Sequence, residues 1–277
     1  MEPTINHKLD DQDLEIGHGL VPHMVPTCPN TQPMHTHRPL QLRGGTPPNP
    51  TKAGSIVLVA LNVRGANSAA TWDKWKTIIR SMLSKKIAIL SILESHSDNE
   101  QIKKLNSQYS PNLHFTHTSD PQNPRSKGIV IVMNKNKINS IPSNFKSISP
   151  GRAISFMLNW PEENKINVLA MYAPNTPNEN TEFWNEILTK TENEVIPPTN
   201  IMIGDLNMVE DAMDRIPAHP DPTPTVESLL ELKKKLGLID SWHQTNPPPD
   251  CGYTFEQPSR GSRLCIDRIY ITDDIFS

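Results

Sequence analysis

Apolar residues follow two distinct patterns in the chain beyond residue 54. Continuous apolar runs at 55–61 and 87–93 are typical of strands that are buried on both faces of a sheet. Between them, the apolar residues of 71–85 recur every three or four positions, which predicts an amphipathic helix. Strand, helix and strand in this order predict a right-handed crossover unit within a sheet.

Further strands and helices follow this unit in an irregular order. Apolar runs predict additional strands, and helical spacing predicts additional helices. The strands are expected at 128–133, 153–159, 166–172, 200–204 and 268–272, and the helices at 99–107, 181–195 and 225–236. Because single helices separate some strands while others follow one another directly, the expected fold is an α/β sandwich with mixed sheets in one domain.

Residues 1–53 show neither pattern. Proline recurs throughout this segment, and no apolar period persists for more than a few residues. Such a segment cannot bury enough apolar surface to offset its lost chain entropy. We therefore expect a disordered Pro/His-rich tail at 1–53 and a folded domain at 54–277. The tail also holds Cys28, but it shows no Cys-x-x-Cys or His-x3-His spacing typical of a metal site.

Composition excludes several classes of protein. The 277 residues carry a net charge of −3, so the chain is not basic enough to coat nucleic acid by charge alone. It contains no apolar run long enough for a membrane-spanning helix, and its start lacks the pattern of a secretory signal. Three widely spaced cysteines argue against a disulfide scaffold and favour a reducing, intracellular compartment. Nothing indicates an obligate protein partner.

Polar side chains adjoin the ends of the predicted strands. They are Asn62, Glu94, Tyr172, Asp205, Asn207 and Asp267. Taken singly, such an Asn or Asp is usually a turn former or helix cap, and such a Tyr is usually a core residue. As a set, however, they bring acidic and amide groups to one edge of a sheet without matching basic partners. Converging carboxylates repel one another unless a cation joins them, and hard oxygen ligands suit Mg²⁺ or Mn²⁺. A metal held in this way can clamp a phosphate.

Five short strings contain these residues: Leu-Asn-Val-Arg-Gly at 61–65, Leu-Glu-Ser-His at 93–96, Tyr-Ala-Pro-Asn at 172–175, Gly-Asp-Leu-Asn at 204–207 and Ile-Asp-Arg-Ile-Tyr at 266–270. In this order and spacing they resemble the endonuclease/exonuclease/phosphatase superfamily, which includes DNase I. The closest resemblance is to the endonuclease domain of LINE-type non-LTR retrotransposons. The resemblance implies a four-layer α/β sandwich, in which two packed mixed β-sheets are flanked by helices.

The resemblance also implies roles for individual residues. Glu94 would be the principal ligand of Mg²⁺ (or Mn²⁺), with Asn62 beside it. Asp205 would orient or deprotonate the attacking water, Asn207 would hold the phosphate, and Tyr172 would donate a hydrogen bond to a phosphate oxygen. Asp267 matches the acid that orients the catalytic histidine of the family. The residues expected to contact DNA are Asn175, Ser262 and Arg263.

One feature of the family pattern is missing. A Ser-Asp-His motif should lie one strand beyond the position of Asp267, but the sequence stops at 277 before such a motif. We therefore expect the domain to be truncated at its C-terminus, with its last strand missing. The loss of a general acid–base group typically costs 10²–10⁴-fold in rate.

Three functions follow from this pattern. The first is a Mg²⁺-dependent endonuclease that nicks DNA and leaves a 3′-hydroxyl, which implies a nuclear location. The second is a phosphatase that acts on a small phosphorylated substrate, and the third is a catalytically inactive remnant. The strings at 172–175 and 266–270 favour the nuclease branch, whereas the missing motif favours the remnant.

A loosely basic region near a predicted hairpin has two interpretations. It comprises Arg125, Lys127, Lys135, Lys137, Lys146 and Arg152. It could contact phosphates, although a solvated strand edge is the commoner explanation for such a set.

Overall fold

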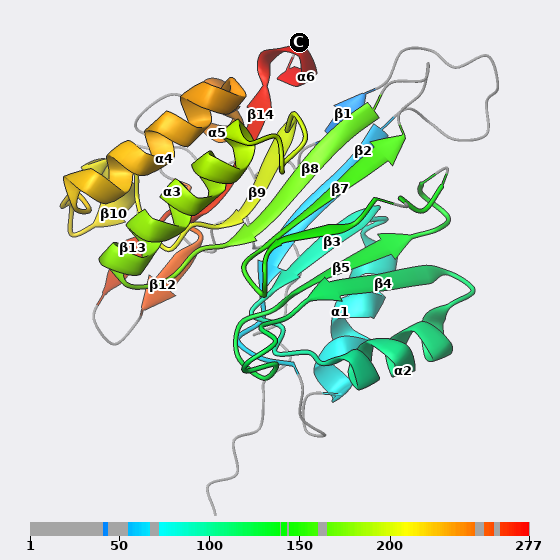
Figure 1. Ribbon diagram of the computed structural model, residues 1–277. Coiled ribbons are helices and arrows are strands. Elements are labelled where there is room, and N and C mark those ends of the chain that lie inside the picture. The colour runs from blue at the N-terminus through cyan, green and yellow to red at the C-terminus, as the bar shows by residue number, and fades with distance from the viewer. Residues whose placement is uncertain are drawn as a thin grey trace, which may run out of the picture.

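The computed structural model of the chain describes residues 41–43, 55–66, 72–138, 140–142, 144–159, 165–246, 252–257 and 261–276 (Figure 1). The predicted tail at 1–53 lies outside the described residues, apart from the strand β1, Gln41–Arg43. Cys28 also lies outside them.

The first sheet has the strand order β1-β2-β3-β5-β4. Its remaining strands are β2 (Ser55–Asn62), β3 (Ile89–Leu93), β4 (Leu113–Thr118) and β5 (Ile129–Asn134). Strands β2 and β3 are parallel, and helix α1, Trp72–Ser84, connects them as the predicted crossover. Helix α2, Asn99–Tyr109, follows β3 and begins at the N-cap Asp98, whose carboxylate accepts the N–H of Gln101.

The second sheet has the strand order β11-β14-β9-β8-β7-β6. Its strands are β6 (Lys146–Ser149), β7 (Ala153–Asn159), β8 (Lys165–Tyr172), β9 (Ile201–Asp205), β11 (Leu238–Asp240) and β14 (Asp267–Thr272). Strands β8 and β9 are parallel, and helix α3, Pro177–Glu192, connects them. Strand β14 is antiparallel to β9 on one side and to β11 on the other.

One long helix and several shorter elements lie beside the second sheet. A three-stranded sheet has the order β10-β13-β12. The remaining elements are the 3-10 helix η2 (Ala212–Asp214), β10 (Arg215–Ile216), α4 (Thr223–Leu236), α5 (Ser241–Thr245), β12 (Phe255–Gln257), β13 (Ser262–Leu264) and α6 (Asp273–Phe276). None of the helices in the described part of the chain combines the length and apolar character that crossing a membrane would require.

The layers follow from the alternation of side chains along the strands. Phe156, Val168 and Ile203 belong to the buried cluster between the two sheets. Trp75 of α1 packs in the apolar cluster on the outer face of the first sheet, and Trp184 of α3 packs in the cluster on the outer face of the second. Figure 1 shows α1 and α2 on one outer face and α3 and α4 on the other. The predicted α/β four-layer sandwich is therefore confirmed.

Candidate functional site

The topology brings five of the predicted site residues to one end of the sandwich. Asn62 ends β2, Tyr172 ends β8 and Asp205 ends β9, while Glu94 directly follows β3. Asp267 begins β14, and because β14 is antiparallel to β9 it lies directly opposite Asp205. The carboxyl ends of neighbouring parallel strands are where α/β sheets assemble binding sites.

Two hydrogen bonds join the first sheet to the second across this end. The Asn62 amide nitrogen donates to Oδ2 of Asp205 at 2.9 Å. The Tyr172 hydroxyl donates to the carboxylate of Glu94. Each bond links residues that are far apart in sequence, so these four side chains form one group only in the folded chain.

Two residues of the site have an unusual backbone conformation, and hydrogen bonds hold the Asp205 carboxylate in place. Glu94 has φ +53° and Asn207 has φ +50°, in the left-handed region that asparagine tolerates but glutamate rarely adopts. The N–H of Asn207 donates to Oδ1 of Asp205 at 2.9 Å, and its side-chain amide donates to the carbonyl of Ala173 at 2.8 Å. Both carboxylate oxygens of Asp205 therefore accept hydrogen bonds that set its orientation. Strained backbone of this kind is commonly found at functional sites.

The site carries an excess of negative charge. Asp205 is 3% exposed, and burial raises its pKa to about 6, with a further contribution from the charge of Glu94. Burial and the neighbouring Asp205 raise the pKa of Asp267 well above its usual range. Burial and the Glu94 carboxylate also raise the pKa of the Tyr172 phenol. The nearby Arg64 guanidinium only partly opposes the shifts at the two aspartates. A bound cation would offset this charge.

The donor atoms available at the site fit Mg²⁺. Glu94 offers a carboxylate, and Asn62 offers an amide oxygen that also accepts the N–H of Arg64 at 3.0 Å. No group of three or more His, Cys, Asp or Glu residues in the described part of the chain is arranged as a metal cage. Mg²⁺ is commonly bound through one or two carboxylates together with water, and hard oxygen donors of this kind suit it.

Of the residues predicted to contact substrate, Asn175 adjoins this group, whereas Ser262 and Arg263 lie outside it. Asn175 is exposed, with its side-chain oxygen 3.4 Å from the Tyr172 hydroxyl. Ser262 and Arg263 lie on β13, where Arg263 donates to Glu256 on the adjacent strand at 3.3 Å. Among the described contacts, none joins Ser262 or Arg263 to Asn62, Glu94 or Asp205. The structure therefore places them on a neighbouring hairpin.

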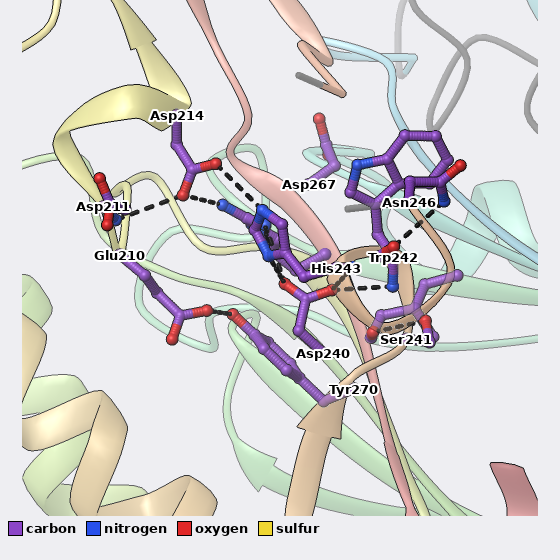
Figure 2. A network of polar contacts seen from close by, with 12 residues as sticks. Glu210, Asp211, Asp214, Asp240, Ser241, Trp242, His243, Asn246, Asp267 and Tyr270 are labelled. Carbon is purple, nitrogen blue, oxygen red and sulfur yellow. Dashed lines mark hydrogen bonds and ion pairs between the residues drawn. The ribbon is translucent and has the colours of Figure 1, made fainter. Parts of the chain in front are cut away.

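Arg268 directly follows Asp267 on β14, so the two side chains point to opposite faces of the strand. Arg268 belongs to a separate polar network, whose members Asp214, Asp240 and His243 are labelled in Figure 2. Its guanidinium pairs with the carboxylates of Asp214 and Asp240. His243 contacts the same carboxylates, with Nδ1 3.0 Å from Asp240 and Nε2 3.5 Å from Asp214. Figure 2 shows the Asp267 carboxylate outside this network. His243 is thus not oriented by Asp267.

Two arginines near the site were not among the predicted site residues. The guanidinium of Arg64 lies 5.2 Å from the centroid of the Phe255 ring. The guanidinium of Arg152 lies 4.7 Å from the centroid of the Tyr172 ring and donates to the Ala173 carbonyl. The sequence offers only a weak signal for Arg152, which directly precedes a buried strand within a loosely basic region.

These features define a nuclease-like phosphodiesterase fold with a carboxylate, amide and tyrosine group at one end of the sandwich. Residues 59–276 match the sequence profile of the Endonuclease/Exonuclease/phosphatase family. The chain belongs to this family, which confirms the resemblance drawn from the five strings.

Solved structures share the fold at low sequence identity. The AP endonuclease LMAP from Leishmania major has a TM-score of 0.60 and 16% identity, covering 78% of each chain. An AP endonuclease from Archaeoglobus fulgidus has a TM-score of 0.61 and 14% identity over 79% of this chain and 87% of its own. The endonuclease domain of TRAS1, a telomere-specific non-LTR retrotransposon, has a TM-score of 0.53 and 15% identity over 78% of this chain and 85% of its own. These likenesses show the fold.

A sequence relative comes from a mobile element. The chain is 31% identical over 134 residues to the Transposon TX1 uncharacterized 149 kDa protein of Xenopus laevis. The match covers 47% of this chain and 10% of that protein, so the chain corresponds to a small part of the relative's length.

Proposed function

We propose that residues 54–277 form a Mg²⁺-dependent endonuclease domain that nicks DNA and leaves a 3′-hydroxyl. The observation that carries this proposal is the convergence of Asn62, Glu94, Tyr172 and Asp205 from both sheets at one end of the sandwich. The structural neighbours favour DNA over other phosphate esters, because their names describe AP endonucleases and a retrotransposon endonuclease domain.

The side chains divide the work of hydrolysis. Asp205 takes the proton of an attacking water, and its orientation is set by the amide of Asn62 and the N–H of Asn207. Asn207 would donate to a phosphate oxygen through the amide hydrogen that the Ala173 carbonyl does not accept. The Tyr172 hydroxyl has a single hydrogen, so it would donate to a phosphate oxygen in place of the Glu94 carboxylate once substrate is bound. A donor placed where negative charge develops stabilises the transition state strongly in a site that excludes water.

Glu94 and Asn62 would hold Mg²⁺ or Mn²⁺. The bound ion would neutralise charge on the phosphate and on the departing oxygen. The excess of carboxylates over cations in this group supports the assignment, since burial and mutual repulsion already raise the pKa of Asp205 and of Asp267.

Nicking of supercoiled plasmid tests the proposal. We expect nicking in Mg²⁺ and none in EDTA, and a loss of about 10²–10⁴-fold in rate for Glu94→Gln and for Asp205→Asn. Glu100→Gln is the matched control, because Glu100 is an exposed carboxylate that pairs with Lys103 on the surface of α2. Nicking no faster in the wild type than in Asp205→Asn would refute the proposal. Release of phosphate from a small ester would then indicate a phosphatase instead.

A further inference from the structure

Arg152 links the turn before β7 to the end of β8. Its Nη1 donates to the carbonyl oxygens of Tyr172 and Ala173, at 3.3 and 3.1 Å. Its guanidinium carbon lies 4.7 Å from the centroid of the Tyr172 ring. Its own carbonyl accepts the N–H of Tyr172 at 2.8 Å. One arginine thus contacts both the backbone and the ring of Tyr172.

The Ala173 carbonyl connects Arg152 to a second site residue. The side-chain amide of Asn207 donates to this same oxygen at 2.8 Å. At the other end of the Tyr172 ring, the hydroxyl donates to Glu94. The Tyr172 and Ala173 carbonyls that Arg152 contacts therefore lie between the side chains of Tyr172 and Asn207, which we propose to contact the phosphate.

The turn that carries Arg152 is itself fixed. Gly151 has φ +71°, and a Cβ added there would lie 2.9 Å from the backbone nitrogen of Asp120. The Gly151 carbonyl accepts the N–H of Gly128 at 3.0 Å, and the N–H of Arg152 donates to the carbonyl of Ser149 at 2.9 Å. Because these contacts hold the turn in place, we expect Arg152 to set the position of Tyr172.

Two other basic residues of this region, Lys127 and Lys146, have different partners. Lys127 pairs with Asp120 at 2.9 Å, and Lys146 donates to the Val195 carbonyl at 2.8 Å. Neither of these contacts involves a side chain of the site. A guanidinium can stack on a ring and donate in its own plane at the same time, whereas an ammonium cannot reproduce this geometry.

We infer that Arg152 is a positioning residue, which fixes the Tyr172 phenol on Glu94 and, through the Ala173 carbonyl, the amide of Asn207. This inference rests on the proposed function for its effect on rate. It assigns to Arg152 an indirect role, distinct from that of a surface residue that binds a phosphate.

A spectroscopic test needs no activity. The chain has four tyrosines, so protein labelled with ¹³C at tyrosine Cζ gives a spectrum that Tyr172→Phe assigns. In Arg152→Met, the Tyr172 signal is expected to shift toward its position in Glu94→Ala, in which the acceptor of the phenol is absent. Lys146→Met is the control and should leave the signal in place. A Tyr172 signal unmoved in Arg152→Met, with the fold retained by circular dichroism, would overturn the inference.

Kinetics provide the second test. Arg152→Met is expected to lower kcat by about 10–100-fold with little change in KM, as is typical for residues that orient the groups in contact with substrate. In the Tyr172→Phe background the same change should cost much less, since coupled residues are not additive. Arg152→Lys should restore little activity. Full rescue by lysine, or additive losses, would identify a phosphate contact and contradict the inference. If the wild type does not nick DNA, the proposed function fails, and the Tyr172 signal alone decides the role of Arg152.

Discussion

Replacing His243 with glutamine is expected to remove a loss of stability at alkaline pH. The imidazole lies between the carboxylates of Asp214 and Asp240 in the network of Figure 2. Hydrogen bonds to these two groups raise the pKa of His243 from 6.5 to about 9, although partial burial and the nearby Arg268 guanidinium oppose the shift. The protonated imidazole therefore helps to balance two carboxylates that Arg268 alone would leave in excess.

The direction of the pH dependence follows from this shift. Because the pKa in the folded state lies above that in the unfolded state, protonated His243 contributes its full stability below about pH 6.5 and loses it as the pH rises through about 9. A shift of this size corresponds to about 3 kcal/mol. The His243 side chain is 40% exposed, so solvent screening reduces the expected contribution to roughly 1–2 kcal/mol.

Urea unfolding at about pH 6 and about pH 10 measures this contribution. The wild type should lose roughly 1–2 kcal/mol more than His243→Gln between these two pH values. His114→Gln is the control, because burial lowers the pKa of His114 and places its effect on the acid side. Parallel stability profiles for the wild type and His243→Gln across the alkaline range would refute the reasoning.

Substitutions at three further residues test packing and charge by urea or thermal unfolding. Arg268→Met should cost about 3–5 kcal/mol, because it leaves Asp214 with a buried carboxylate and no guanidinium; a loss under about 1 kcal/mol would contradict this. Trp184→Ala should lower the free energy of unfolding by about 3–5 kcal/mol. Trp184→Phe should lower the free energy of unfolding by less than Trp184→Ala, because the buried indole N–H has no partner in the described part of the chain. Equal losses for the two variants would contradict this. Gly204→Ala should unfold the domain, since its Cβ would lie 1.8 Å from the Met171 carbonyl, and an unchanged Tm would exclude this.

The strands and helices that the sequence predicts most reliably are those buried on both faces or along one stripe. Strand β3 is buried at every position, so its continuous apolar run identifies it directly. Strand β4 was not predicted, because half-buried His114 and His117 interrupt its apolar pattern. Helix α3 begins at Pro177, four residues before the predicted start at 181, and proline at the first helical position is preorganised for a helix.

The sequence could predict those site residues that lie at the ends of strands. Parallel pairing of β2 with β3 brings Asn62 close to Glu94, and parallel pairing of β8 with β9 brings Tyr172 beside Asp205 at one edge of the second sheet. The packing of the two sheets, which the sequence pattern does not determine, then joins the two pairs. Asp267 reaches the same edge from the start of an antiparallel strand. The role of Arg152 could not be predicted, because its contacts to Tyr172 depend on how two strands lie in space.

Analysis of the ends produced in nicked DNA tests the central proposal most directly. A duplex labelled on one strand is incubated with the protein in Mg²⁺, and the nicked product is offered to a DNA polymerase without prior treatment. We predict a 3′-hydroxyl that the polymerase extends, and loss of the product in Asp205→Asn. A duplex that stays intact while phosphate is released from a phosphorylated end, or a nick that cannot be extended, would contradict the account.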